Sequence, residues 1–261
     1  MNATVATSLS SSHSPLRSYL LETRCEFMRM LRTPSFSIPT LAFPVLFYLL
    51  FGVLLAGSRG GAQAGTYLFA SYGVFGVMAP GLFGFGVGIA MDRERGFLKL
   101  KQAMPAPPGA TLMARMLMAI VFAALIVAEV TVIALSLGGV QLSVAQVALL
   151  FVVDVLGVLP FCAIGLWVGS LAGGQGAPAL VNLIYLPMAF LSGLWMPLHV
   201  LPPIFAKIAP VWPAWHLGQL ALKVVGRDSG GAAWIHVLVL AAMAVVFFLL
   251  ARRRLAAGAH A

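Results

Sequence analysis

Long runs of apolar residues recur along the chain and are separated by short polar stretches. The runs have about the 20 residues that a helix needs to cross a bilayer, and they lack the apolar and polar alternation of a membrane β-barrel. Backbone N–H and C=O groups find no water in hydrocarbon, so each run must satisfy them within its own helix. The pattern predicts an all-α, polytopic membrane helix bundle with six transmembrane helices, at 36–57, 67–91, 112–137, 142–171, 179–197 and 234–251.

The segment before the first run has a different pattern. Apolar residues of 16–32 recur at spacings of three and four, and Arg and Glu residues cover the rest of the helical circumference. This periodicity predicts an N-terminal interfacial amphipathic helix that lies on the inner leaflet with its arginines at the lipid phosphates. We expect 1–15 to be a disordered cytoplasmic tail, 16–254 a single transmembrane domain and 255–261 a short cytoplasmic tail.

Between the fifth and sixth runs the chain stays apolar but is broken repeatedly by proline. Apolar stretches of about a dozen residues are too short to span a bilayer and suit re-entrant or interfacial segments. Tryptophan suits the outer headgroup level, where an indole buries its ring and still hydrogen-bonds. We expect two short re-entrant helices on the outer side, with a merely interfacial loop as the alternative. The residues that mark this segment are Ser192, Gly193, Trp195, Pro197, Pro202, Trp212, Trp215 and His216.

Composition and charge agree with a membrane protein and orient it. Hydrophobic residues make up 61% of the chain, the mean hydropathy is +1.00 and the formal net charge is +9. Six crossings place both ends on one side, where 12 of the 16 Lys and Arg residues then lie, against 4 on the other. By the positive-inside rule both termini are cytoplasmic, and we expect a bacterial plasma (inner) membrane. The basic surplus thus indicates topology and attraction to membrane lipid, and it argues against a nucleic-acid partner.

A charged island follows the second run, at 92–101. Only 9% of all residues are charged, yet this stretch reads Asp-Arg-Glu-Arg-Gly-Phe-Leu-Lys-Leu-Lys. Ionisable groups packed this densely are expected to lie in water. The island therefore predicts an aqueous cytoplasmic loop that serves as a contact surface.

Two acids fall inside predicted spans, Glu129 in the third and Asp154 in the fourth. A carboxylate in hydrocarbon costs several kcal/mol, so each is expected to face the bundle interior, find a donor or be protonated. At 1.5 Å per residue they lie about 12 and 18 Å from the turn that joins the two spans. One interpretation is a polar element that lines a substrate path or binds a cation or proton. The other is structural, with both carboxyls hydrogen-bonded to groups such as Thr131, Gln146 or Asn182.

Small residues in two of the spans predict close helix contact. The second span holds six glycines and Pro80, which predicts a kinked helix that neighbours approach closely. The fourth span ends in Gly165, Gly169 and Gly173, at the small-xxx-small spacing. These patterns do not indicate which helix is contacted.

Motifs for chemistry are missing from the sequence. The Gly-rich stretches at 57–65 and 173–176 lack the Lys and hydroxyl of a P-loop, so the chain is not expected to be an enzyme. The histidines form no HExxH-like ligand set, and neither Cys25 nor Cys162 belongs to a CxxC pair. We therefore predict no catalytic residue, no metal site and no cofactor in this chain.

Four features in order resemble the permease subunit of a type-2 ABC exporter. They are the amphipathic N-terminal helix, six spans, a D-R-E-R-G-x-L loop after the second span and an L-S-G-x-x-x-P-x-x-x-L-P segment after the fifth. The resemblance implies a dimer of permeases, homodimeric or heterodimeric, with separate cytoplasmic ABC ATPases that hold the ATP and Mg. It implies export of drugs, of lipid-linked or polysaccharide substrates or of other amphipathic compounds, and the apolar interior of this chain favours a drug-like, lipid or other amphipathic compound. Glu129 and Asp154, by their places within spans, are the candidates for the path. It also implies that the charged loop couples the ATPase to the spans, through Asp92, Arg93, Glu94, Arg95, Gly96, Phe97, Leu98 and Lys99.

Two positions depart from the pattern of that family. Phe97 and Lys99 stand where a small hydroxyl residue and an acid are usual, which predicts a more apolar and basic docking face. The alternative function is an ATPase-independent secondary transporter or channel that uses Glu129 and Asp154 for proton or cation coupling. Inverted repeats would favour that alternative, and the two halves of the sequence show no convincing similarity.

Overall fold

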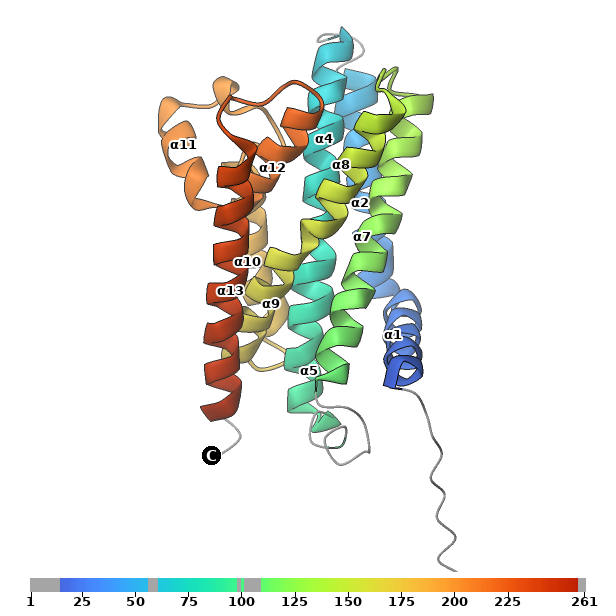
Figure 1. Cartoon of the computed structure of the whole chain (residues 1–261), viewed down its shortest axis with the longest axis vertical. Coiled ribbons are helices and arrows are strands. Elements are labelled where there is room, and N and C mark those ends of the chain that lie inside the picture. The colour runs from blue at the N-terminus through green and yellow to red at the C-terminus, as the bar shows by residue number, and fades with distance from the viewer. Residues whose placement is uncertain (1–14, 56–60, 98–99, 101–108, 258–261) are drawn as a thin grey trace, which may run out of the picture.

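The computed structural model describes residues 15–55, 61–97, 100 and 109–257, which form an elongated helix bundle (Figure 1). Within those ranges no residue lies in a β-strand, which confirms the all-α prediction. The main hydrophobic core joins the second span to its neighbours and encloses large side chains such as Phe69, Tyr72, Met78 and Phe161. The bundle is therefore organised around the second span.

Five helical stretches of the described residues are long and apolar enough to cross a membrane. They correspond to the predicted first, second, third, fourth and sixth spans. Their elements are α2 (Pro34–Phe47) with η1 (Tyr48–Leu55), α4 (Gly61–Ala79) with η2 (Pro80–Val87) and α5 (Gly88–Glu94), α7 (Ala110–Ser136), α8 (Val144–Leu156) with α9 (Val158–Leu171), and α13 (Ala233–Ala257).

The predicted fifth span is shorter than expected. Its helix, α10 (Ala177–Leu191), has 15 residues, which is about 22 Å of helix against a hydrocarbon core of about 30 Å. The helix ends before Gly193, which takes a φ of 78° that favours glycine. Residues 192–197, predicted as part of the span, are not helical, and 192–196 form turns and bends. Of six predicted spans, the described chain thus confirms five by length and composition.

The second span packs with its backbone against α9. Pro80 has no N–H to donate, and Pro80–Val87 is π-helical. A Cβ on Gly86 would lie 2.7 Å from the Cα of Gly165, and a Cβ on Gly165 would lie 2.6 Å from the carbonyl oxygen of Gly81. The predicted close approach is confirmed, and the helix approached is α9. This contact is called the glycine seam below.

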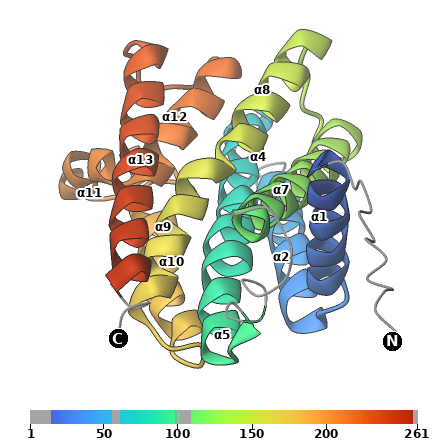
Figure 2. The same cartoon turned by 60° about the horizontal axis from the view of Figure 1, so that its bottom comes forward.

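The predicted N-terminal helix is present as α1 (Pro15–Leu31). Figure 2 shows it running beside α7. Phe27 of α1 and Phe36 of α2 both pack on Phe122 of α7, with ring centroids 5.2 and 5.5 Å apart. Leu16 and Leu20, near the start of α1, stay exposed. The helix is thus fixed to the third span through its second half.

Short helices follow α10 at the end of the bundle opposite α1 (Figure 1). They are η3 (Leu198–Val200), α11 (Pro203–Ile208), η4 (Ala209–Val211) and α12 (Pro213–Val224). Trp195 stacks on Phe47 and meets Phe75 edge-on, each with centroids 5.9 Å apart. Its buried Nε1 has no hydrogen-bond partner in the described part of the chain. For Trp195 the expectation of a hydrogen-bonding indole is wrong, because aromatic rings of the first two spans surround it.

Candidate functional site

The charged island does not lie wholly in water, because its first residue is buried. Asp92 is in α5 and only 3% exposed. Its carboxylate accepts hydrogen bonds from Arg29 of α1, at 3.2 and 3.1 Å, and from the buried Arg115 of α7. The prediction of an aqueous position is therefore wrong for Asp92, since two guanidinium groups replace its water.

Asp92 belongs to a larger set of charges, namely Glu26, Arg29, Asp92 and Arg115, called the ion cluster below. Oε2 of Glu26 lies 2.8 Å from Nη2 of Arg29, and Oε1 of Glu26 lies 3.7 Å from Nη2 of Arg115. The guanidinium of Arg115 uses space left by Gly88, where a Cβ would lie 2.9 Å from Nη1. Two acids balance two bases, which is the condition under which buried charges are tolerated. The ion cluster thus joins α1, α5 and α7 without net charge.

Arg93 binds the end of α9. Its guanidinium donates to the carbonyl oxygen of Ser170 at 3.0 Å and to that of Ala172 at 2.7 Å. The last carbonyls of a helix have no partner within the helix and carry partial negative charge, so an arginine suits this place. Arg254 of α13 donates to the same Ser170 carbonyl at 3.4 Å. The first two residues of the island are thus anchored to neighbouring helices.

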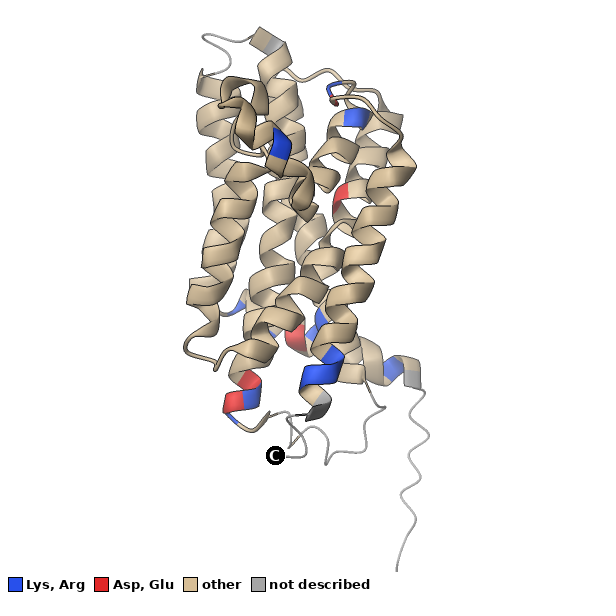
Figure 3. Cartoon of the chain, turned by 90° about the vertical axis from the view of Figure 1, so that its left-hand side faces the viewer, with Lys and Arg blue, Asp and Glu red and all other residues tan. Residues whose placement is uncertain are grey.

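The following residues of the island face outward. Glu94, Arg95 and Phe97 are exposed and are called the outward face below. Gly96 has a φ of 74° where α5 has ended. Leu98 and Lys99 lie outside the described residues. Figure 3 shows the Lys and Arg segments at the two ends of the bundle, and the island lies at one of them.

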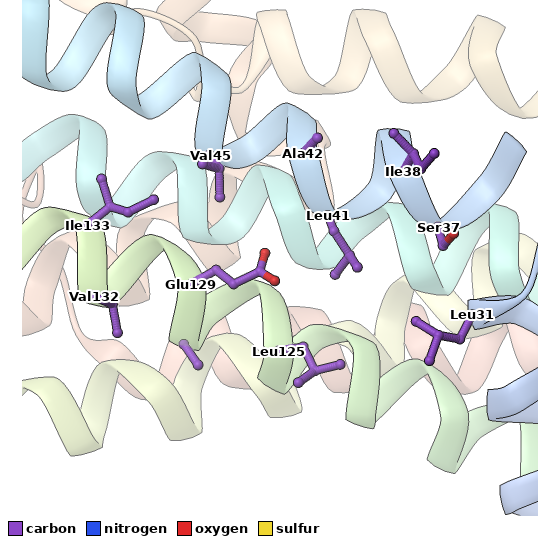
Figure 4. Close-up of a pocket in the computed structure, with 11 residues that line it drawn as sticks. Leu31, Ser37, Ile38, Leu41, Ala42, Val45, Leu125, Glu129, Val132 and Ile133 are labelled. Atoms are coloured by element: carbon purple, nitrogen blue, oxygen red, sulfur yellow. The ribbon is translucent and has the colours of Figure 1, made fainter. Parts of the chain in front are cut away.

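Glu129 of α7 is exposed and extends into an open groove between α2 and α7 (Figure 4). The groove has a volume of about 720 Å³. No hydrogen bond or ion pair within the described ranges involves the Glu129 carboxyl group. Of the three predicted alternatives, the structure therefore supports neither burial in the bundle interior nor a donor, and protonation stays a prediction. The groove is lined by Leu31, Ser37, Ile38, Leu41, Ala42, Val45, Leu125, Ala128, Glu129, Val132 and Ile133.

Asp154 of α8 lies in the interior instead. It is 1% exposed, and neither carboxyl oxygen has a hydrogen-bond partner among the described residues. Its Oδ2 faces Gly73 of α4, where a Cβ would be 2.6 Å away. Gln146, one of the expected partners, donates to the Val224 carbonyl at 3.2 Å. The neutral acid is the form that this enclosure accommodates, because an ionised carboxylate would lose its water without compensation.

The other end of the bundle holds a histidine pair that the sequence did not reveal. Nδ1 of His216 on α12 lies 3.0 Å from Nδ1 of His236 on α13, and both residues are 6% exposed. Nε2 of His216 lies 2.9 Å from the carbonyl oxygen of Pro210. Because a carbonyl only accepts, neutral His216 carries its proton on Nε2 and then accepts at Nδ1 from His236. Trp215 packs edge-on against both rings, with centroids 4.9 and 5.3 Å apart.

Of the remaining residues that mark the outer segment, Ser192 and Gly193 follow the end of α10, and the others lie at the ends of the short helices. The carbonyl of Gly193 accepts a hydrogen bond from the Tyr67 hydroxyl at 2.8 Å. Pro197 and Pro202 immediately precede η3 and α11, and Trp212 immediately precedes α12. Pro197 and Pro202 thus separate short helices, in agreement with the prediction that prolines break this segment, and Trp212 lies at another such boundary.

The cysteines and the potential metal ligands of the described residues are dispersed. No group of three or more His, Cys, Asp or Glu residues there is arranged to hold a metal ion. Cys25 is exposed, Cys162 is buried, and both are free thiols. The groups with evident functional geometry are therefore the ion cluster, the outward face, the two membrane acids and the histidine pair.

Comparison with known proteins covers most of this architecture. A protein-family model described as ABC-2 type transporter matches residues 18–225. The chain is also similar to a protein of Bacillus subtilis (strain 168) named "Putative transport permease YvfS", with 26% identity over 228 residues. That alignment covers 87% of this chain and 92% of the Bacillus protein. The family match includes the ion cluster, the outward face and both membrane acids.

Proposed function

The chain belongs to the ABC-2 type transporter family, and on this premise we propose that it is the transmembrane permease subunit of an ATP-driven exporter. A separate cytoplasmic ABC ATPase binds ATP and Mg, and this chain performs no covalent chemistry. The observation that carries the proposal is the division of the charged island into an anchored part and an outward face.

The anchored part makes the island suitable for coupling. Asp92 bonds to α1 and α7, and Arg93 bonds to the end of α9. The ATPase docks on the outward face, where Phe97 offers apolar contact and the charges of Glu94 and Arg95 select the partner. When ATP closes the ATPase pair, the displacement of this face passes through the ion cluster to the spans and opens the path by alternating access.

The proposed topology has six crossings and both termini in the cytoplasm of a bacterial plasma membrane. α10 provides the fifth crossing, although it is about 8 Å shorter than the hydrocarbon core. The bilayer accommodates such a mismatch by local thinning, and residues 192–197 add length to the crossing. α11 and α12 then form re-entrant helices in the outer leaflet. The arginines of α1 and of the end of α13 support this orientation.

The proposed transporter contains two permeases and two ATPase subunits. The second permease is another copy of this chain or a related protein, and the path runs between the two. The apolar groove beside α2 and α7 supports a drug-like, lipid or other amphipathic substrate.

Exchange of charges on the outward face tests the proposal. The double variant Glu94→Lys with Arg95→Glu keeps the net charge, and we expect it to reduce ATPase co-purification and ATP hydrolysis by about tenfold or more. The matched control is Lys223→Asp with Asp228→Lys, which exchanges a 2.8 Å ion pair at the other end of the bundle. We expect the control to retain its ATPase. Undiminished co-purification and hydrolysis in a folded Glu94 and Arg95 double variant would refute the coupling role.

Asp154 supports a second candidate function, a secondary transporter without an ATPase. A buried carboxyl without a partner among the described residues suits a proton or cation site in such a protein. Proteoliposomes that hold the chain alone distinguish the two functions. Substrate flux driven by a pH gradient and lost in Asp154→Asn would favour the secondary transporter, whereas flux that needs the ATPase and ATP would exclude it.

A further inference from the structure

The groove between α2 and α7 contains one ionisable side chain. Of the described residues that line it, Glu129 alone can carry a charge, and the others are apolar except Ser37. The Ser37 hydroxyl already donates to the Thr33 carbonyl at 3.2 Å. Figure 4 shows the Glu129 side chain extending from α7 toward Leu41 and Val45 of α2. The groove thus presents a single carboxylate on an apolar surface.

Glu129 lies at membrane depth, and no described Lys or Arg lines the groove. It precedes the end of α7 at Ser136 by about 10 Å along the helix axis, and it follows Arg115 by about 21 Å. Arg115 and Arg29 are paired within the ion cluster. A carboxylate at this depth loses hydration, and no donor in the described part of the chain replaces the lost water. Among the described residues no basic side chain supplies the positive charge that would stabilise the ionised form of Glu129, so a bound cation would supply it.

We propose that the groove binds a lipophilic monocation, an amphipathic compound with one positive charge on an apolar body. Its volume of about 720 Å³ lies within the range of small-molecule sites, about 300–1,000 Å³. Ile38, Leu125 and Val132 contact the apolar body, and the Glu129 carboxylate pairs with the cation in a low-dielectric setting that strengthens their attraction. The inference rests on the proposed function, because it names the substrate class of that exporter.

The rim of the groove allows entry from the bilayer. Ile38 is 63% exposed and Val132 is 64% exposed on the flank of the bundle, at the level of the spans. An amphipathic cation partitions into the membrane and reaches such a rim by lateral diffusion. The carboxylate then selects the charged compound from the neutral lipids that contact the same apolar walls.

A second copy of this chain is a poorer occupant. Between their ends the described spans carry no Lys or Arg except Arg115, which is fully buried. The described spans of a second copy would therefore bring no Lys or Arg to pair with an ionised Glu129, and an unpaired charge at such a contact is costly. Charge complementarity thus favours a small cation over a protein surface.

Binding of tetraphenylphosphonium tests the site. The full chain in lipid nanodiscs is titrated with this labelled cation, and with triphenylphosphine oxide as a neutral compound of similar apolar character. We expect saturable cation binding that Glu129→Gln weakens by about tenfold or more and that Glu129→Asp largely retains. The neutral compound is expected to bind the wild type and Glu129→Gln equally. Asp228→Asn, which removes a carboxylate outside the groove, is expected to leave cation binding unchanged.

Several outcomes would overturn the site. Equal cation affinity of the wild type and Glu129→Gln would do so, as would disulfide cross-linking of two copies through Ile38→Cys, because a second copy would then cover the groove. ATPase co-purification from the same preparations separates this inference from the proposed function. Retained ATPase without cation binding would refute the site alone, whereas Glu129-dependent binding without any ATPase would support the site and refute the proposed function.

Discussion

Replacing Arg115 by methionine is expected to destabilise the folded chain by about 3–5 kcal/mol, the usual cost of removing one partner from a buried set of charges. The variant keeps an unbranched apolar side chain in place of the arginine stem but leaves Glu26 and Asp92 with Arg29 as their remaining partner in the ion cluster. Arg29 is 41% exposed, so its charge is partly screened by water. The two buried carboxylates then repel each other without adequate compensation.

A second substitution checks that charge is the cause. In the double variant Arg115→Met with Asp92→Asn, the ion cluster keeps one acid, Glu26, and one base, Arg29, whose charged groups lie 2.8 Å apart. We expect this variant to recover about 1–3 kcal/mol of the loss, the usual size of coupling between contacting groups. If the loss came only from altered packing around position 115, the second substitution would recover nothing.

Thermal unfolding of the purified full chain in detergent measures these effects. With about 2–4 °C per kcal/mol for a chain of this size, Arg115→Met should lower the midpoint by about 6–20 °C. Arg252→Met, which removes an exposed arginine of α13, serves as the control and should change the midpoint little. A shift in Arg115→Met no larger than that of the control would refute the role assigned to the ion cluster.

Three further predictions concern other parts of the bundle. Gly86→Ala puts a Cβ against the backbone of α9 and should cost about 1–3 kcal/mol, seen as a lower unfolding midpoint; an unchanged midpoint would contradict the glycine seam. Gly73→Ala should lower the stability of the wild type but should be nearly neutral in Asp154→Ala, because that variant lacks the oxygen that lies 2.6 Å from the new Cβ. If the losses of stability from the two substitutions were additive in a double-mutant cycle, that contact would be refuted. Burial lowers the pKa of His216, against the opposing effect of its bond to the Pro210 carbonyl. Its folded pKa thus lies below the unfolded value of about 6.5, so the folded chain should lose stability as the pH falls below about 6.5. That loss should be smaller in His216→Phe when midpoints at pH 7.5 and 5.5 are compared, and an equal loss in both proteins would exclude His216 as its source.

Run length and hydropathy were sufficient to predict the helical class and five of the spans, because hydrocarbon leaves the backbone few alternatives. They did not predict where α10 ends. The apolar run continues through Gly193 to Pro197, and composition does not report that Gly193 takes a positive φ. The boundary therefore depends on a backbone conformation that hydropathy does not describe.

The candidate site was predicted only where its signal is local in sequence. Residues 92–97 stand out by charge density, but the partners that bury Asp92 lie 63 and 23 positions away. Counting residues along the predicted helices gave the depths of Glu129 and Asp154 in the membrane. It could not show which side of each helix is covered by neighbouring helices. The partners His216 and His236 are 20 positions apart on separate helices. Each of these features depends on tertiary packing, which no local pattern of residues encodes.

The glycine seam makes the contact between the second span and α9 stiff, and the second span leads from the outward face into the bundle. Side chains at an ordinary helix contact yield by changing rotamer, but the seam places backbone against backbone and offers no such compliance. Arg93 ties the same two helices together at their common end. We therefore expect the second span and α9 to move together as one body, and we expect relative motion within the bundle to occur at its other helix contacts.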